Sequence, residues 1–101
     1  MGDRMRRAAR VDRNHGEIIA AFTRLGFSVA DTSMMGQGFP DCVIAKHKRT
    51  AMCEIKDGAK SPSKRRLTED QIEFRDWWKG TYLVVNSVDE ALAISKSWGA
   101  S

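Results

Sequence analysis

Cysteine and histidine are scarce in this chain, and long apolar runs are missing from it. The 101 residues include two cysteines and two histidines, too few and too scattered for a structural zinc site. No run of 18 apolar residues is present, and the arginine-rich N-terminus lacks the apolar segment of a signal peptide. No internal repeat or low-complexity segment interrupts the sequence. We therefore expect one cytoplasmic domain with a modest core, since 42% of the residues are hydrophobic.

Two short apolar segments carry the most informative charged residues. Residues 41–46 and 51–56 are both typical of strands, and the four polar residues between them predict a hairpin loop. In that register Asp41 faces Lys56. Because side chains alternate along a strand, Asp41, Glu54 and Lys56 are predicted to project from one face of the sheet. Asp41 and Glu54 would be diagonal neighbours, with Cα atoms roughly 7–8 Å apart.

These three side chains suit a site that holds a divalent metal ion and a phosphate. Mg²⁺ or Mn²⁺ takes one or two carboxylates plus phosphate oxygens, so Asp41 and Glu54 are the candidate ligands, with the backbone carbonyl of Ile55 as a third. Such an ion activates a water and polarises the phosphate, and Lys56 would orient that water or stabilise the transition state. The pattern predicts phosphodiester hydrolysis. The alternative is an ordinary hairpin with a surface salt bridge, but both strands are otherwise apolar on both faces.

Both cysteines, Cys42 and Cys53, fall on the opposite face of the same two strands. The expected register makes them diagonal, with Cα atoms roughly 7–8 Å apart, which is beyond the usual span of a disulfide. We therefore expect them to be reduced core residues, as is usual in a cytoplasmic protein.

Basic residues occur in clusters, and the formal net charge is +4. The candidate phosphate contacts are Lys48 and Arg49 at the hairpin turn and Lys60, Lys64, Arg65 and Arg66 in the loop after the second strand. Each such contact would add salt dependence to DNA binding, while a solvated surface is the alternative for any one cluster. Residues 1–12 are basic, and would form either an arm that becomes ordered on DNA or a solubilising tail.

The remaining elements predict the fold class. Helical patterns cover residues 13–25, the segment after Thr68 as far as Lys79, and residues 88–98, and further strands are expected at 27–30 and 82–85. A hairpin combined with helical crossovers predicts an α/β fold: a small α/β/α sandwich around a four-stranded mixed sheet. Residues 13–101 are expected to form this single domain.

Gln71 has two competing interpretations. Thr68 and Gln71 fit a capping box, and Leu67 with Ile72 fits the accompanying hydrophobic staple, so helix capping alone explains the glutamine. A functional role requires the N-terminus of that helix to point at the metal, where its dipole would also favour a phosphate.

The order of these elements resembles the PD-(D/E)xK nuclease superfamily and, within it, the virus-type replication-repair nuclease (VRR-NUC) domain. The likeness covers roughly residues 14–95. It rests on the motifs Gly-Phe-Pro-Asp at 38–41, Glu-Ile-Lys at 54–56 and Leu-Thr-x-x-Gln at 67–71. It implies a restriction-endonuclease-like fold.

The resemblance also implies roles for the matching residues. Asp41 and Glu54 would be metal ligands, Lys56 the catalytic lysine and Gln71 an active-site glutamine. Glu17 would be the first-helix glutamate that completes the metal site. Taken from the residues alone, Glu17 borders the apolar stripe of its helix and is more simply a surface glutamate.

The implied activity is structure-specific cleavage of DNA. Stand-alone members of the family are homodimers that cut branched DNA, Holliday junctions included, and fused members serve in DNA repair and restriction. Two copies related by a two-fold axis would place paired sites on opposite strands. Two alternatives stay open. One is a nicking or restriction-type nuclease that reads sequence, and the other is a non-catalytic DNA-binding module whose binding is indifferent to metal.

Overall fold

The computed structural model describes residues 11–99, so most of the predicted basic arm (residues 1–12) lies outside the described part. The helices are α2 (His15–Arg24), α3 (Glu69–Trp77) and α4 (Val88–Trp98), with a short 3-10 helix η1 (Pro62–Arg65). The strands are β1 (Ser28–Asp31), β2 (Cys42–Lys46), β3 (Arg49–Ile55) and β4 (Thr81–Val85). None of the helices within 11–99 is long and apolar enough to span a lipid bilayer.

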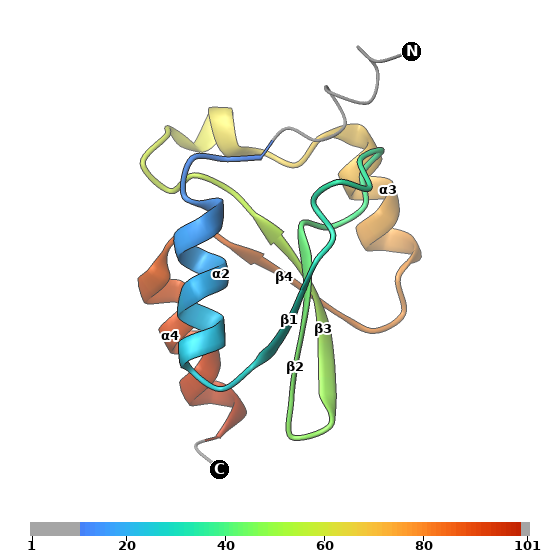
Figure 1. Ribbon diagram of the computed structural model, residues 1–101. Helices are drawn as coiled ribbons and strands as arrows, with labels where there is room; N and C mark the ends of the chain where they lie inside the picture. The colour runs from blue at the N-terminus through green and yellow to red at the C-terminus, as the bar shows by residue number, and fades with distance from the viewer. Residues whose placement is uncertain (1–10, 100–101) are drawn as a thin grey trace.

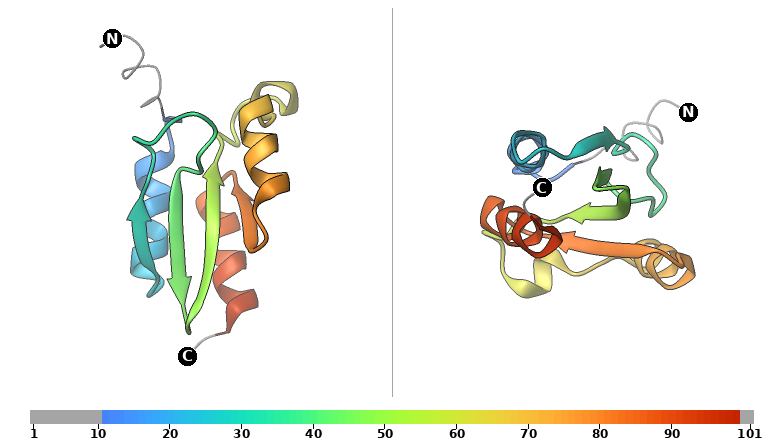
Figure 2. Two further views of the ribbon diagram at one scale, coloured as in Figure 1. Left: turned by 90° about the vertical axis from the view of Figure 1, so that its right-hand side faces the viewer. Right: turned by 90° about the horizontal axis from the view of Figure 1, so that it is seen from below.

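The four strands form one mixed sheet, as predicted, and their order in it is β1-β2-β3-β4. The first three strands are antiparallel neighbours, and β4 runs parallel to β3. A parallel neighbour requires a crossover connection, which η1 and α3 provide. Helices α2 and α4 lie together on one face of the sheet and α3 lies on the other (Figures 1 and 2).

The hydrophobic core lies between the sheet and the α2–α4 pair. Ile18 and Phe22 of α2 are fully buried, as are Ile44 and Ile55 of the sheet. The helical spacing of the α2 residues and the alternation along β2 and β3 bring these side chains to one layer. This face of the sheet is therefore mainly apolar, and Asp41 and Glu54 lie on the other face.

The opposite face is covered less completely. Helix α3 buries none of its own residues fully. It contacts its surroundings through Phe74, whose ring lies 5.1 Å from that of Phe39 and 6.3 Å from that of Tyr82. The N-terminal end of α3 lies near the start of β2, where polar side chains from several segments meet.

The hairpin between β2 and β3 is tighter than predicted. Lys46 pairs with Arg49, so the turn contains only His47 and Lys48, with φ of 55° and 64°. Positive φ at both central residues is the geometry of a type I′ turn, whose twist matches that of the strands. The expected four-residue loop is therefore wrong, and the register shifts by two residues.

That shift changes the pairing but preserves the faces, because the side-chain period along a strand is two. Cys42 pairs with Cys53, so the next position places Asp41 opposite Glu54 rather than opposite Lys56. The two cysteines are direct neighbours instead of diagonal ones, which corrects the prediction. Both are free and fully buried on the core side of the sheet, as expected.

Candidate metal and phosphate site

Asp41 is positioned by the proline that precedes it. By the β2–β3 register, Pro40 would be the ladder partner of Ile55, and its carbonyl would be the acceptor for the Ile55 N–H. The N–H of Ile55 donates instead to Oδ2 of Asp41 at 2.8 Å, and the Pro40 carbonyl accepts a 2.7 Å hydrogen bond from Oγ1 of Thr32. The end of the ladder thus fixes the carboxylate of Asp41. Pro40 also has no N–H to offer the Ile55 carbonyl, whose predicted role as a third ligand stays a prediction.

Glu54 is the most deeply buried charged group of the site, with 3% of its surface exposed. Its Oε2 accepts a 2.9 Å hydrogen bond from Nε2 of Gln71 and lies 3.8 Å from Nζ of Lys56. Its Oε1 is buried and has no hydrogen-bond partner among residues 11–99. A buried carboxylate oxygen without a partner is costly, so this atom marks a place for a cation or a proton.

Gln71 joins the charged residues to the start of α3. Its Oε1 accepts hydrogen bonds from the Thr68 N–H and from Nζ of Lys56, each at 2.9 Å. Its own N–H donates to Oγ1 of Thr68 at 3.2 Å, which completes the predicted capping box. The two interpretations of Gln71 are therefore compatible, because one side chain caps the helix and also orients Glu54 and Lys56.

The carboxyl groups of Asp41 and Glu54 both have a raised pKa. Burial, followed by the charge of Asp41, raises the pKa of Glu54 to about 9. Burial also raises the pKa of Asp41, although the Ile55 N–H opposes this. Two adjacent carboxylates cannot both ionise cheaply, so together they hold a proton when nothing else balances their charge. A divalent cation would supply that balance.

The four side chains Asp41, Glu54, Lys56 and Gln71 line a polar cavity of about 300 Å³. Among residues 11–99, no three acidic, histidine or cysteine side chains already converge at metal-binding distance. Of the predicted metal ligands, the carboxylates of Asp41 and Glu54 belong to residues that line the cavity, whereas Ile55 does not line it. This set suits Mg²⁺, which keeps several waters and binds through few carboxylates.

Glu17 lies elsewhere. It is exposed on α2 and lines a separate cavity of about 400 Å³ with Arg13, Asp57 and the start of α4. The acid that does line the Asp41–Glu54 cavity is Asp12, which the sequence analysis assigned to the basic arm. Its position directly before the predicted first helix was the available signal.

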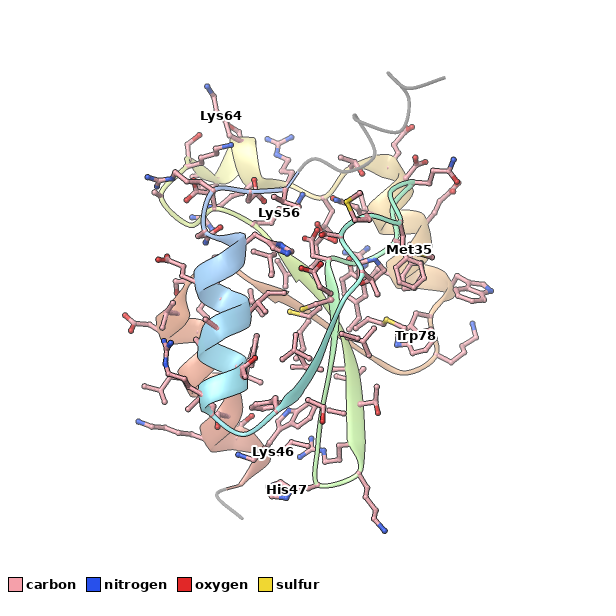
Figure 3. The ribbon with its side chains drawn as sticks, viewed as in Figure 1. Met35, Lys46, His47, Lys56, Lys64 and Trp78 are labelled. Atoms are coloured by element: carbon pink, nitrogen blue, oxygen red, sulfur yellow. The ribbon has the colours of Figure 1, made fainter. Side chains whose placement is uncertain are left out.

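The predicted phosphate contacts divide between the two ends of the sheet (Figure 3). Lys60 lines the Asp41–Glu54 cavity. Lys64 lies at the same end as Lys56, on η1, whereas the hairpin turn at His47 is at the opposite end. Arg65 is also on η1, and Arg66 follows it. Lys48 belongs to the distant hairpin turn. Cζ of the neighbouring Arg49 lies 4.4 Å from the centre of the Trp98 ring. The structure thus places Lys60 at the site and Lys64 at the same end of the sheet, whereas Arg65 lines the separate cavity of Glu17. Lys48 and Arg49 lie apart from the site.

No protein-family model, curated protein or solved structure matches this chain. The likeness to VRR-NUC domains accordingly stays a prediction.

Proposed function

We propose that this protein is a metal-dependent endonuclease that hydrolyses phosphodiester bonds in DNA, with the restriction-endonuclease-like fold of the PD-(D/E)xK superfamily. One observation carries the proposal. The buried Glu54 keeps an unpartnered oxygen on the face shared with Asp41, and Gln71 ties it to Lys56. Paired carboxylates beside a lysine, in an open polar cavity, are suited to a phosphate and its metal ion.

Each residue has a defined task in this proposal. Asp41 and Glu54 hold Mg²⁺ or Mn²⁺, with the Ile55 carbonyl as a further oxygen. The bound ion polarises the phosphate and makes a water more acidic. Lys56 has three N–H donors, of which one is held by Gln71 at 2.9 Å. The other two can donate to a phosphate oxygen or to the attacking water, which they orient and stabilise.

The substrate and assembly are part of the same proposal. Lys60 lines the cavity and Lys64 lies at the same end of the sheet, so these two side chains are the proposed phosphate contacts beside the site, with Arg65 and Arg66 following in the same loop. One chain carries one Asp41–Glu54 pair, and cutting both strands of a branched DNA requires two. We therefore propose a homodimer that acts on junctions, with the preference for branched DNA carried by the family resemblance. Sedimentation at equilibrium tests the dimer independently of activity.

The test of catalysis is cleavage of a labelled four-way junction and of a linear duplex with the same arm sequence. Wild type, Lys56→Ala and the control Lys96→Ala are compared in Mg²⁺, Mn²⁺ or EDTA. Lys96 is exposed on α4, on the other face of the sheet. We expect metal-dependent nicking of the junction by wild type and Lys96→Ala, and its loss in Lys56→Ala. Equal cleavage of the linear duplex would favour the restriction-type alternative. Binding of both DNAs without cleavage in any metal would contradict catalysis and favour a binding module.

A further inference from the structure

Asp12 occupies the place at the cavity that the resemblance would give to Glu17. It lines the same polar cavity as Asp41 and Glu54, and its side chain is 26% exposed. Its Oδ1 lies 3.9 Å from Nζ of Lys60, which lines the cavity as well. At that separation the ion pair is weak, so either side chain can take another partner at little cost in free energy.

An acidic cluster alone does not define a cation site, but the cavity contains a second, independent feature. Oε1 of Glu54 belongs to a side chain that is 4% exposed, and it has no hydrogen-bond partner among residues 11–99. Glu54 lines the cavity together with two other acidic residues, Asp12 and Asp41. Glu54 and Asp41 lie within hydrogen-bonding reach of each other, so this buried oxygen is balanced either by a proton shared by the two acids or by a cation that replaces the proton.

We infer that Asp12 is the third carboxylate of the divalent-cation site and that Lys60 holds it as an ion pair until the cation binds. This inference rests on the proposed function, because it concerns the same metal. It assigns to Asp12 the position that the family pattern would give to Glu17, which faces a different cavity.

The backbone around both residues permits this exchange. The Asp12 carbonyl accepts a 3.0 Å hydrogen bond from the His15 N–H, so the chain is anchored at the start of α2 while the carboxylate stays able to rotate. Lys60 is anchored in the same way, since its N–H donates to Asp57 and its carbonyl accepts from Nε of Arg65, each at 3.0 Å. Rotation about its side-chain bonds is the movement by which Asp12 would leave Lys60 and approach the other two acids that line the cavity.

The exchange has a consequence for DNA binding. When Asp12 turns to the cation, the ammonium group of Lys60 is released at the edge of the cavity, where a phosphate would lie. Cation binding and phosphate binding are thereby coupled through one ion pair. Removing Lys60 should strengthen cation binding, because Asp12 no longer has to be released, and should weaken DNA binding.

The test is Mn²⁺ binding without DNA, measured from the EPR signal of the free ion and repeated by calorimetry with Mg²⁺. The variants are Asp12→Asn, Glu17→Gln and Asp41→Asn, with circular dichroism melts to check folding. We expect Asp12→Asn to raise the Kd about tenfold or more and Asp41→Asn to raise it further. Glu17→Gln should bind like wild type. Lys60→Ala should lower the Kd, whereas Lys64→Ala should leave it unchanged.

The outcomes separate the two proposals. If wild type binds Mn²⁺ and Asp41→Asn does not, but Asp12→Asn binds normally, the role of Asp12 is refuted while the proposed function stands. Weaker binding in Glu17→Gln alone would return the third position to that residue. Unchanged or weaker binding in Lys60→Ala would refute the Asp12–Lys60 exchange. If folded wild type binds neither ion, the proposed function itself fails.

Discussion

Nε2 of Gln71 donates a 2.9 Å hydrogen bond to Oε2 of Glu54, while the same side chain completes the capping box of α3. The start of a helix and the buried acid of the site are therefore joined through one residue. This arrangement links the stability of α3 to the geometry of the carboxylates, and the two contributions can be separated by mutation.

Replacing Gln71 should affect both the helix and the site, whereas replacing Thr68 should affect only the helix. Thr68→Ala removes the other half of the capping box and should cost about 1 kcal/mol of stability. Gln71→Ala should cost at least as much and should also weaken Mn²⁺ binding about tenfold, because Glu54 and Lys56 lose the partner that orients them. Urea unfolding of both variants measures the loss of stability, and Mn²⁺ titration measures the loss of metal affinity. Equal Mn²⁺ affinities in the two variants would contradict the orienting role.

The metal-free protein should lose stability as the pH rises, owing to Glu54. Its pKa is raised to about 9 in the folded state, against an ordinary value of 4.5 in the unfolded chain. Between these values the folded state retains a proton that the unfolded state releases, so the free energy of unfolding falls from about pH 4.5 to about pH 9. The raised pKa of Asp41 acts in the same direction.

Glu54→Gln tests this pH dependence. The variant has no carboxyl proton to lose, so in EDTA it should be more stable than wild type at pH 8.5 and close to it at pH 4.5. Its stability should vary less with pH, as followed by thermal melts in matched buffers. Mg²⁺ at pH 8.5 should stabilise wild type and leave the variant unchanged. A wild type whose stability rises steadily across this range would show that the acid pair is not the controlling group.

Gly38 sets the distance between the loop before β2 and helix α3. Its φ is +83°, and a Cβ added there would lie 2.5 Å from the carbonyl oxygen of Asp70. Gly38→Ala should therefore destabilise the fold by about 1–3 kcal/mol, and it should weaken Mn²⁺ binding because α3 carries Gln71. Gly16→Ala is the matched control, since nothing lies within 4 Å of its added Cβ. In α2 that change should stabilise by about 0.5–1 kcal/mol. Similar melting curves for the two variants would contradict the close contact.

DNA binding should depend on the basic residues at the site end of the sheet and not on those at the hairpin turn. Lys64→Ala should weaken binding to duplex DNA and lower the slope of log affinity against log salt by about one unit, as expected for one lost phosphate contact. Lys48→Ala removes the same charge at the far end and should change neither quantity. Fluorescence anisotropy at several salt concentrations, in EDTA, measures both. A larger effect from Lys48→Ala would place the DNA on the opposite end of the molecule.

The helices, the strands and the two faces of the sheet could be predicted from local sequence patterns. The helical spacing of Ile18 and Phe22 and the apolar residues of the strands predicted a mixed four-stranded sheet with covering helices, and Thr68 with Gln71 predicted the cap. Because strand side chains alternate with period two, Asp41 and Glu54 were expected on one face, and the two-residue error in register left that expectation intact.

The tertiary structure decided which residues from distant segments meet. His47 and Lys48 lack the glycine or asparagine that signals a two-residue turn, so the register could not be predicted from local sequence. The packing of α2 against α4 directed Glu17 to another cavity, while the chain entering α2 placed Asp12 beside Asp41 and Glu54. The spacing of apolar residues along a helix or strand is a local property that can be read from the sequence. The position of a helix on a sheet instead depends on how whole apolar faces pack, and this decides which charged side chains share a cavity.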